Sequence, residues 1–460
     1  MRQRFVTFAV FGLILVGLAE WNLRARKLVP LSSLNDFWLE FCAGNAGDKL
    51  ASPAVTVVRI NDDYEPLSLG EDSPAAEDGR LSRLDFATIL GFVAKQNPKA
   101  VTFLPTPSFD ESLVLNQTDI VPLKDAAMQL PRLVVASNVS NDGEQAADAS
   151  PLNYAPIQVA GDPAEILAFT RTVRRPDPQL LANGDPVFKT IESARNLSSE
   201  EELRIPLVAR YRDQLVPSIT LASVARHAGI ANDQIVIDLS GAAPVIRLGE
   251  MREIPIESDG TFIVPPFAGV KRGMSSIETA EDGSQSRILD FTSLTVDELA
   301  YTGEEDDEVA KRILASFQPK FDSLKRNLVV VGFDRTADRR FTTAKGEALS
   351  ETMLMARAMA TIQSGRFIEL WPGWLRWVAV IAIAAIAAFL FRQPQGRFLA
   401  LWALAFLLFF GACVLAFRSN LSWTPPFFAF ALFGLMLLIG LLLKADSGST
   451  SSTEEEAGES

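Results

Sequence analysis

The sequence predicts an α/β domain, a mixed sheet with flanking helices, joined to an α-helical membrane unit. Through the middle of the chain, β-branched runs alternate with amphipathic helical patterns. Near the end lie three apolar runs of about 20 residues, each long enough to cross a bilayer as a helix. A shorter apolar run, Phe5–Ala19, lies near the start. The three closing runs are Leu370–Phe391, Phe398–Phe417 and Trp423–Leu443.

The first apolar run allows two interpretations. Arg2 and Arg4 precede a short apolar core with small residues behind it, which fits a cleavable signal peptide. Left uncut, the run reaches Leu23 and forms an N-terminal transmembrane anchor over residues 1–23, the interpretation we favour. Under either interpretation, the domain that follows crosses the membrane.

Alternation of the spans predicts the topology. With Arg2 and Arg4 inside, residues 30–368 form an extracytoplasmic (periplasmic) domain and residues 370–444 form three transmembrane helices. The short connectors Arg392–Arg397 and Arg418–Ser422 make neighbouring helices antiparallel. Residues 445–460 are a disordered acidic tail in the cytoplasm. We therefore expect a multi-pass protein of the inner or plasma membrane, in contact with membrane lipids.

Composition excludes several functions. A net charge of -13 argues against nucleic-acid binding, since no basic stripe could neutralise phosphates. His227 is the only histidine, so a Ser-His-Asp triad would have no histidine to spare and a multi-histidine zinc site cannot form. The chain also has no P-loop, CxxC or GxGxxG motif. We expect no catalytic residue, no cofactor and no metal site, and hence no enzyme.

The two cysteines are predicted to lie apart and not to pair. Cys413 falls within the predicted span Phe398–Phe417, whereas Cys42 lies in a short amphipathic helix, Asn35–Gly44. Cys42 could cross-link two chains of a homodimer. The interpretation we favour is an unpaired residue in an apolar patch with Phe37, Trp38 and Phe41.

The first half of the domain reads as a βαβ unit with an extension. A buried strand is bounded by an alanine-proline pair and an Asn-Asp-Asp turn, and an amphipathic helix and a second strand follow. Such crossovers favour a parallel sheet beneath helices. The predicted elements are the strands Val55–Ile60, Ala100–Leu104 and Leu133–Ala136, and the helices Leu84–Lys95 and Leu123–Leu130.

The second half changes character. Ser218 caps a helix that runs through His227, and turn signals separate short strands that read as an antiparallel layer. A final αβ unit and a helix that leads into the membrane close the domain. The predicted strands are Ile205–Tyr211, Gln214–Val216, Ile235–Leu239, Val245–Leu248, Phe262–Val264 and Asn327–Gly332; the predicted helices are Glu308–Phe317 and Leu349–Ser364.

In order and topology, the chain up to Lys444 resembles the CHASE2 family, extracytoplasmic sensory domains of bacterial signalling proteins with one span before the domain and three after it. The segments that carry the resemblance are Val55–Asp63, Asn97–Phe103, Arg204–Val208, Leu215–Leu221, Ile254–Ile256 with Asp259-Gly260, and Leu324–Gly332. The resemblance implies a membrane-anchored sensor or interaction protein.

The chain departs from the family pattern at three places. Asp78–Arg83 replaces a tryptophan-proline segment, Leu104-Pro105 replaces an aspartate, and Leu349–Ala360 lacks the usual glycine-valine-histidine-alanine signature. We also expect no output domain behind the spans, so signal transduction requires a separate signalling or envelope protein as partner. The lost signatures favour an alternative, a structural envelope scaffold derived from a degenerate sensor.

Candidate ligand-binding residues follow the strands. Asp62 and Asp63 come after the first strand, at the edge where a doubly wound sheet offers its crevice. Asp110 and Asp334 follow two further strands and could converge there with Asp338. The alternative is a set of solvated turns that cap the loops. Arg204 could bind an anion, or could pair with surface acids.

Overall fold

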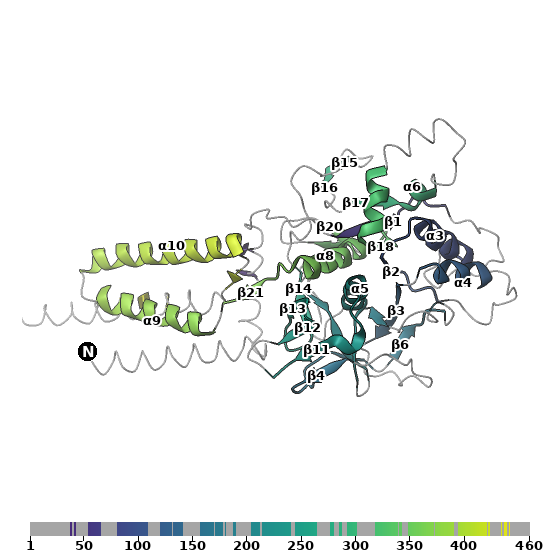
Figure 1. Ribbon diagram of the computed structural model, residues 1–460. Helices are drawn as coiled ribbons and strands as arrows, with labels where there is room; N and C mark the ends of the chain where they lie inside the picture. Colours follow the sequence, from purple (N-terminus) through teal and green to yellow (C-terminus); the bar gives the residue numbers. More distant parts are fainter. Residues whose placement is uncertain are drawn as a thin grey trace, which may run out of the picture. The chain divides into compact units, whose positions relative to one another are not determined.

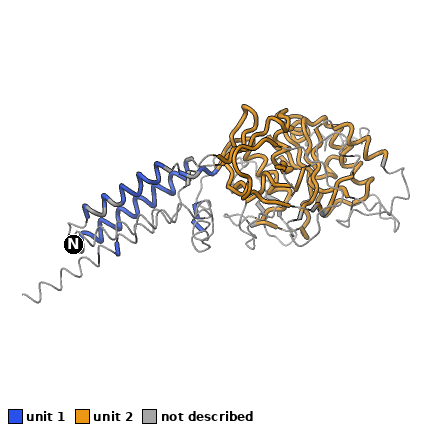
Figure 2. Tube along the Cα trace, turned by 90° about the horizontal axis from the view of Figure 1, so that it is seen from below, with its two compact units in different colours: residues 1–47, 368–460 blue, residues 48–367 orange. Residues whose placement is uncertain are grey.

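The computed structural model divides the chain into two compact units (Figure 2): an α/β unit, residues 48–367, and a helical unit, residues 1–47 with 368–460. The residues that the structure describes are 37–38, 41–42, 54–65, 81–108, 120–130, 132–140, 157–169, 171–177, 180, 187–189, 204–211, 214–240, 244–264, 277–279, 285–287, 292–300, 318–338, 340–342, 348–371, 373–390, 394–420, 422–423, 434, 437–438 and 441.

A seven-stranded sheet forms the centre of the α/β unit, in the order β17-β1-β18-β2-β3-β6, with β7 also paired to β3. All neighbours are parallel except β3 and β6, so the predicted mixed sheet is confirmed. The last strand, β18, lies between β1 and β2. The strands are β1 Val55–Ile60, β2 Ala100–Phe103, β3 Leu133–Ser140, β6 Arg171–Arg174, β7 Val187–Lys189, β17 Thr292–Thr295 and β18 Leu328–Phe333.

Helices cover both faces of this sheet (Figure 1). One apolar core lies beneath α3 (Arg83–Lys95), α4 (Ile120–Met128) and α6 (Val296–Ala300), and the other beneath α5 (Ile219–Ala228) and α8 (Glu351–Ser364). Side chains of β18 alternate between the two cores because successive strand residues point to opposite faces. Val329 and Val331 join the first core, and Leu328 and Val330 the second.

Polar residues set the helix ends. The Ser82 hydroxyl accepts a hydrogen bond from the backbone N–H of Asp85, whose side chain accepts one from the Ser82 N–H, a capping box that starts α3. Ser218 and Ser350 cap α5 and α8 in the same position. Both helices end at a glycine with positive φ: Gly229 at 79° and Gly365 at 68°.

Smaller sheets complete the α/β unit. The predicted antiparallel layer is confirmed for β11 and β12, but β14, expected in it, pairs instead with β8. The sheets have the orders β13-β12-β11-β4, β10-β9-β5, β14-β8, β15-β16 and β19-β20. Their strands are β4 Gln158–Ala160, β5 Ala168–Phe169, β8 Arg204–Pro206, β9 Val208–Tyr211, β10 Gln214–Pro217, β11 Ile235–Asp238, β12 Val245–Leu248, β13 Arg252–Pro255, β14 Thr261–Ile263, β15 Ile277–Thr279, β16 Gln285–Arg287, β19 Arg340–Thr342 and β20 Ala348–Ser350.

The helical unit contains a hairpin of α9 (Gly373–Leu390) and α10 (Gln395–Asn420). Before α9, β21 (Glu369–Leu370) pairs with β22 (Ser422–Trp423), which follows α10. The start of α9 and the end of α10 therefore lie together, as antiparallel neighbours require.

Among the described residues one helix, Gly396–Ser419, is long and apolar enough to cross a membrane, rather than the four predicted. The apolar stretch of α9, Trp374–Ile383, is shorter. The opening run and most of Trp423–Leu443 lie outside the described residues, as do the predicted helix Glu308–Phe317 and the acidic tail.

The four described residues of the segment Asn35–Gly44 are helical. Trp38 stacks on Phe41 with ring centroids 5.4 Å apart, and its ring centroid lies 5.3 Å from that of Phe410 in α10. Cys42 and Cys413 are both buried and free. Burial, together with the nearby Cys413, raises the pKa of the Cys42 thiol to about 12. Cys42 lies near Cys413 because this segment contacts α10.

Candidate functional site

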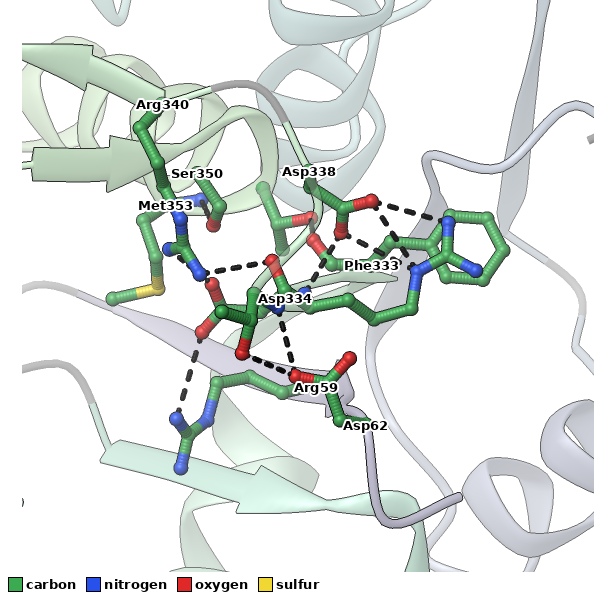
Figure 3. Close-up of polar contacts among 11 residues, drawn as sticks. Arg59, Asp62, Phe333, Asp334, Asp338, Arg340, Ser350 and Met353 are labelled. Carbon is green, nitrogen blue, oxygen red and sulfur yellow. Dashed lines mark hydrogen bonds and ion pairs between the residues drawn. The ribbon is translucent and has the colours of Figure 1, made fainter. Parts of the chain in front are cut away.

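At the carboxyl edge of the central sheet, where β1 and its neighbour β18 end, six charged side chains form a connected network (Figure 3). We call it the charge network. Its elements meet because β1 pairs with β18 along its whole length, which brings the two following loops together. Its members are Arg59, Asp62, Asp334, Arg335, Asp338 and Arg340.

Asp334 lies at the centre of the network. Its carboxylate accepts a hydrogen bond from Nη1 of Arg340 at 2.8 Å, and Nη1 of Arg59 lies 3.5 Å from its other oxygen. The side chains of Asp334 and Arg59 are each only 11% exposed. Because partly buried ion pairs are screened less by water and salt, these contacts hold the end of β1 to the start of the β18–β19 connection.

Asp338 folds back onto the same connection. It accepts a hydrogen bond from the backbone N–H of Arg335 at 2.8 Å and another from Nη2 of the Arg335 guanidinium at 3.1 Å. That guanidinium also lies over the ring of Phe333, 4.1 Å from its centroid. Arg340 donates to the carbonyl of Arg335 at 3.0 Å, so the turn is held from both sides.

Asp62 reaches the network from the exposed loop after β1. Its carboxylate accepts hydrogen bonds from the hydroxyl of Thr336 at 2.5 Å and from the Thr336 backbone N–H at 2.8 Å. These two bonds lower the pKa of Asp62, and the positive charges of Arg335 and Arg340 lower it further. The carboxylate is thus committed to the protein's own groups.

Asp63 points into a more acidic neighbourhood. It accepts a hydrogen bond from Asn61 at 2.7 Å. Burial raises the pKa of Asp297, at the start of α6, and the negative charges of Asp63, Glu298 and Glu65 raise it further. Within the part of the chain that the structure describes, no group of three His, Cys, Asp or Glu residues is arranged to hold a metal ion.

The charge network is chemically self-contained. Its three aspartates and three arginines have formal charges that sum to zero, and the carboxylates are engaged by arginines or by Thr336. It joins β1, β18 and the following turn. Next to it, the Thr352 hydroxyl of α8 donates to the carbonyl of Phe333 at 2.6 Å, which ties the first turn of α8 to the same edge.

The other predicted ligand residues lie elsewhere. Arg204 belongs to β8, outside the central sheet, where its buried guanidinium forms an ion pair with Glu257 at 3.4 Å. The anionic partner of Arg204 is therefore an acid of the same chain. Asp110 lies outside the described residues. Of the predicted set, the structure brings together Asp62 and Asp334, with Asp338; ligand binding by these residues stays a prediction.

A second group of charged residues, at the amino edge of the same sheet, was not predicted from the sequence. Arg326, Lys99 and Arg132 are exposed and lie one or two positions before β18, β2 and β3, which are neighbours in that order. Arg132 also donates to the carbonyl of Arg226, in the last turn of α5, at 3.2 Å. In the sequence, a basic residue precedes each of these three strands. The three residues can be recognised as one group only when the order of the strands in the sheet is known.

His227 lies among these residues and is partly buried. Its Nε2 is 3.2 Å from the carbonyl of Arg326, and its Nδ1 is 3.3 Å from Nε2 of Gln363 in α8. Burial lowers the pKa of His227, and the positive charges of Lys99 and Arg132 lower it further. We call Lys99, Arg132, Arg226 and Arg326, grouped around His227, the basic rim.

Comparison of the chain with protein-family models, curated proteins and solved structures gives no match in any of the three.

Proposed function

We propose that the chain is a membrane-anchored extracytoplasmic sensor or interaction protein of CHASE2 type, which relays a signal through its membrane helices to a separate partner. The resemblance described above and the apolar helix α10 support this proposal. In this topology the α/β unit lies outside the cytoplasm, on one N-terminal and three C-terminal spans. The unit senses or binds, and it carries out no catalysis.

The observation that carries the proposal is the course of α8. Its first turn is tied to the carboxyl edge through Thr352, and residues 352–362 are all buried against the sheet and α5. Its last residue, Ser364, is separated from the first residue of α9 by eight residues. In the proposed relay, a change at the charge network is passed to the membrane helices along α8.

Membrane anchoring is tested by tryptophan quenching. All seven tryptophans lie in the helical unit, at positions 21, 38, 371, 374, 377, 402 and 423, and none lies in residues 48–367. In nanodiscs of brominated lipid, we expect strong quenching of the tryptophan fluorescence of the full chain. Emission equal to that in unbrominated discs would contradict the anchoring.

Signal relay is tested by photo-crosslinking in native membranes. A photoreactive residue replaces Leu407 of α10, whose side chain is 62% exposed. We expect a cross-linked partner whose yield changes severalfold when Asp334→Asn weakens the charge network. The matched control is Asp322→Asn, which removes the same charge from an exposed pair with Lys325. Equal yields for wild type and both variants would contradict relay.

The alternative is a structural envelope scaffold, favoured by the lost family signatures at Asp78–Arg83 and Leu349–Ala360. Deletion of Leu31–Gly365 separates the two functions. A scaffold loses only assembly or envelope integrity when the domain is removed. A sensor loses a stimulus-dependent response while the envelope stays intact.

A further inference from the structure

Three cations of the basic rim, Lys99, Arg132 and Arg326, are not neutralised by ion pairs within the described part of the chain. None of the ion pairs formed by described residues involves Lys99, Arg132 or Arg326. The chain as a whole has a net charge of -13, so its acids outnumber its bases. A group of cations without ion-paired acids therefore offers a specific attraction for an external anion.

The cations form a row rather than a pocket. Arg326, Lys99 and Arg132 precede neighbouring strands, and neighbouring strands lie about 4.8 Å apart. Arg226 extends the row at the end of α5. Arg252 adds a further cation near the end of α8, since its guanidinium fills the space that a Cβ on Gly365 would occupy. An extended row of exposed charges suits an anionic surface better than a single small anion.

Among the described residues, the charges that act on the pKa of His227 are those of Lys99 and Arg132, both positive. Lys99 and Arg132 approach it from the starts of β2 and β3, Arg226 precedes it on α5, and Arg326 offers its carbonyl. The residue that contacts it from α8 is the neutral Gln363. An anion placed over the rim would stabilise the protonated imidazole and so raise the pKa of His227.

Both connections of the α/β unit to the helical unit leave from this edge. The chain enters β1 here, where the carbonyl of Ala54 accepts a hydrogen bond from the N–H of Leu328 at the start of β18. It leaves here too, because Gln363, near the last residue of α8, contacts His227. Only eight residues separate α8 from α9, so under the proposed anchoring this edge meets the membrane surface at a high effective concentration.

We propose that the basic rim docks on the phosphate groups of anionic membrane lipids. This proposal rests on the membrane anchoring proposed above. Each lysine or arginine near an anionic bilayer strengthens association roughly fivefold. The row therefore makes the domain bind anionic membranes in preference to neutral ones. Because Gln363 near the end of α8 contacts His227, docking at this edge affects the end of α8. The charge of the lipid is then one of the signals that the domain detects.

The test uses the single histidine as a probe. The full chain, free of any histidine tag and labelled with ¹³C at histidine, is placed in nanodiscs of pure phosphatidylcholine or of phosphatidylcholine with phosphatidylglycerol. NMR titration gives the pKa of His227 in each. We expect a pKa higher by roughly half a unit or more in the anionic discs, because the negative surface stabilises the imidazolium. A trace of gadolinium-chelating lipid should broaden the His227 signal more strongly in the anionic discs.

The variant Lys99→Gln/Arg132→Gln/Arg326→Gln should abolish both effects of lipid charge and weaken docking roughly a hundredfold. The matched control, Lys124→Gln/Arg247→Gln/Lys320→Gln, loses the same charge from α4, β12 and a side chain paired with Glu298, and should keep both effects. Thermal unfolding by circular dichroism checks that both variants fold.

Other outcomes overturn the proposal. An unchanged pKa and equal broadening in the two kinds of disc would mean that the rim does not meet lipid. A pKa shift caused by inorganic phosphate in neutral discs, but not by anionic lipid, would assign the rim to a free anion. Tryptophan quenching in the same discs reports anchoring separately, so loss of the lipid effect with intact quenching contradicts docking alone.

Discussion

At the carboxyl edge of the central sheet two aspartates contact three arginines, and the third aspartate, Asp62, accepts hydrogen bonds from Thr336. At the amino edge of the same sheet, by contrast, Lys99, Arg132 and Arg326 form no ion pair with a described residue. The carboxyl edge is where open α/β sheets bind ligands by general rule. Here its charged groups are engaged with one another. Position in the fold therefore locates a candidate site, but the balance of charge within that site decides what it can still bind.

The largest effect should come from opening the carboxyl edge. Asp334→Ala removes the carboxylate that Arg59 and Arg340 contact, and all of these side chains are wholly or partly shielded from water. We expect a loss of about 3 kcal/mol in the free energy of unfolding of the α/β unit. All four tyrosines lie within residues 48–367 and all seven tryptophans lie outside them, so the tyrosine band of the near-UV circular dichroism, resolved from the tryptophan band, reports this unit during urea unfolding of the full chain in detergent.

Asp322→Ala is the control for this prediction. Asp322 and Lys325 are about half exposed, and such pairs contribute less than about 1 kcal/mol. Equal losses for the two variants would remove the distinction between a shielded network and ordinary surface pairs.

The next effect concerns the close approach of α8 to β18 beside the charge network. A Cβ on Gly332 would meet Cγ2 of Thr352 at 2.9 Å and Cβ of Thr352 at 3.1 Å. Gly332→Ala should therefore cost about 2 kcal/mol of stability by overpacking. Gly91→Ala in α3, where a Cβ meets nothing within 4 Å, should stabilise by roughly 0.5–1 kcal/mol. A neutral result at Gly332 would show that α8 can shift away from the strand.

A smaller effect should appear at the amino edge as a dependence on pH. Because the pKa of His227 is lowered in the folded protein, the unfolded chain takes up this proton first as the pH falls below 6.5. This contribution to stability is thus complete above pH 6.5 and declines below it. Thermal unfolding between pH 7.5 and pH 5 should show a shallower decline in His227→Gln than in wild type. Parallel curves would place no titration at this histidine.

The smallest effect is expected at Asp62, which is exposed. Asp62→Asn keeps an oxygen that can accept from Thr336 and loses only a screened charge, so the midpoint of urea unfolding at pH 7 should hardly move. Wild type should lose stability relative to this variant below about pH 3.8, since the lowered pKa of Asp62 favours the folded state only while the carboxylate is charged. A large loss at pH 7 would make Asp62 a second centre of the network.

Local patterns predicted most elements because their signals are short in range. Ser82 with Asp85, and Ser218, mark helix starts through hydrogen bonds within one turn, and β-branched runs such as Val55–Ile60 mark buried strands. The order of the strands is a long-range property. The insertion of β18 between β1 and β2 joins residues about 270 positions apart, and no local pattern encodes it.

The candidate sites divide in the same way. The aspartates after β1 and β18 could be predicted to converge, because parallel strands end at one edge. Their engagement by Arg59, Arg335 and Arg340 could not, since it depends on side-chain geometry. The basic rim combines three strand starts with the end of α5, so it becomes visible only when the sheet order is known.

The most direct test of the contrast between the two edges is the pKa of His227, measured by NMR on the full chain in neutral detergent. We expect a pKa below 6.5 that rises in Lys99→Gln/Arg132→Gln and stays unchanged in the control Lys124→Gln/Arg247→Gln. A value of 6.5 or higher, or one that does not respond to loss of the two rim cations, would contradict an amino edge of uncompensated positive charge.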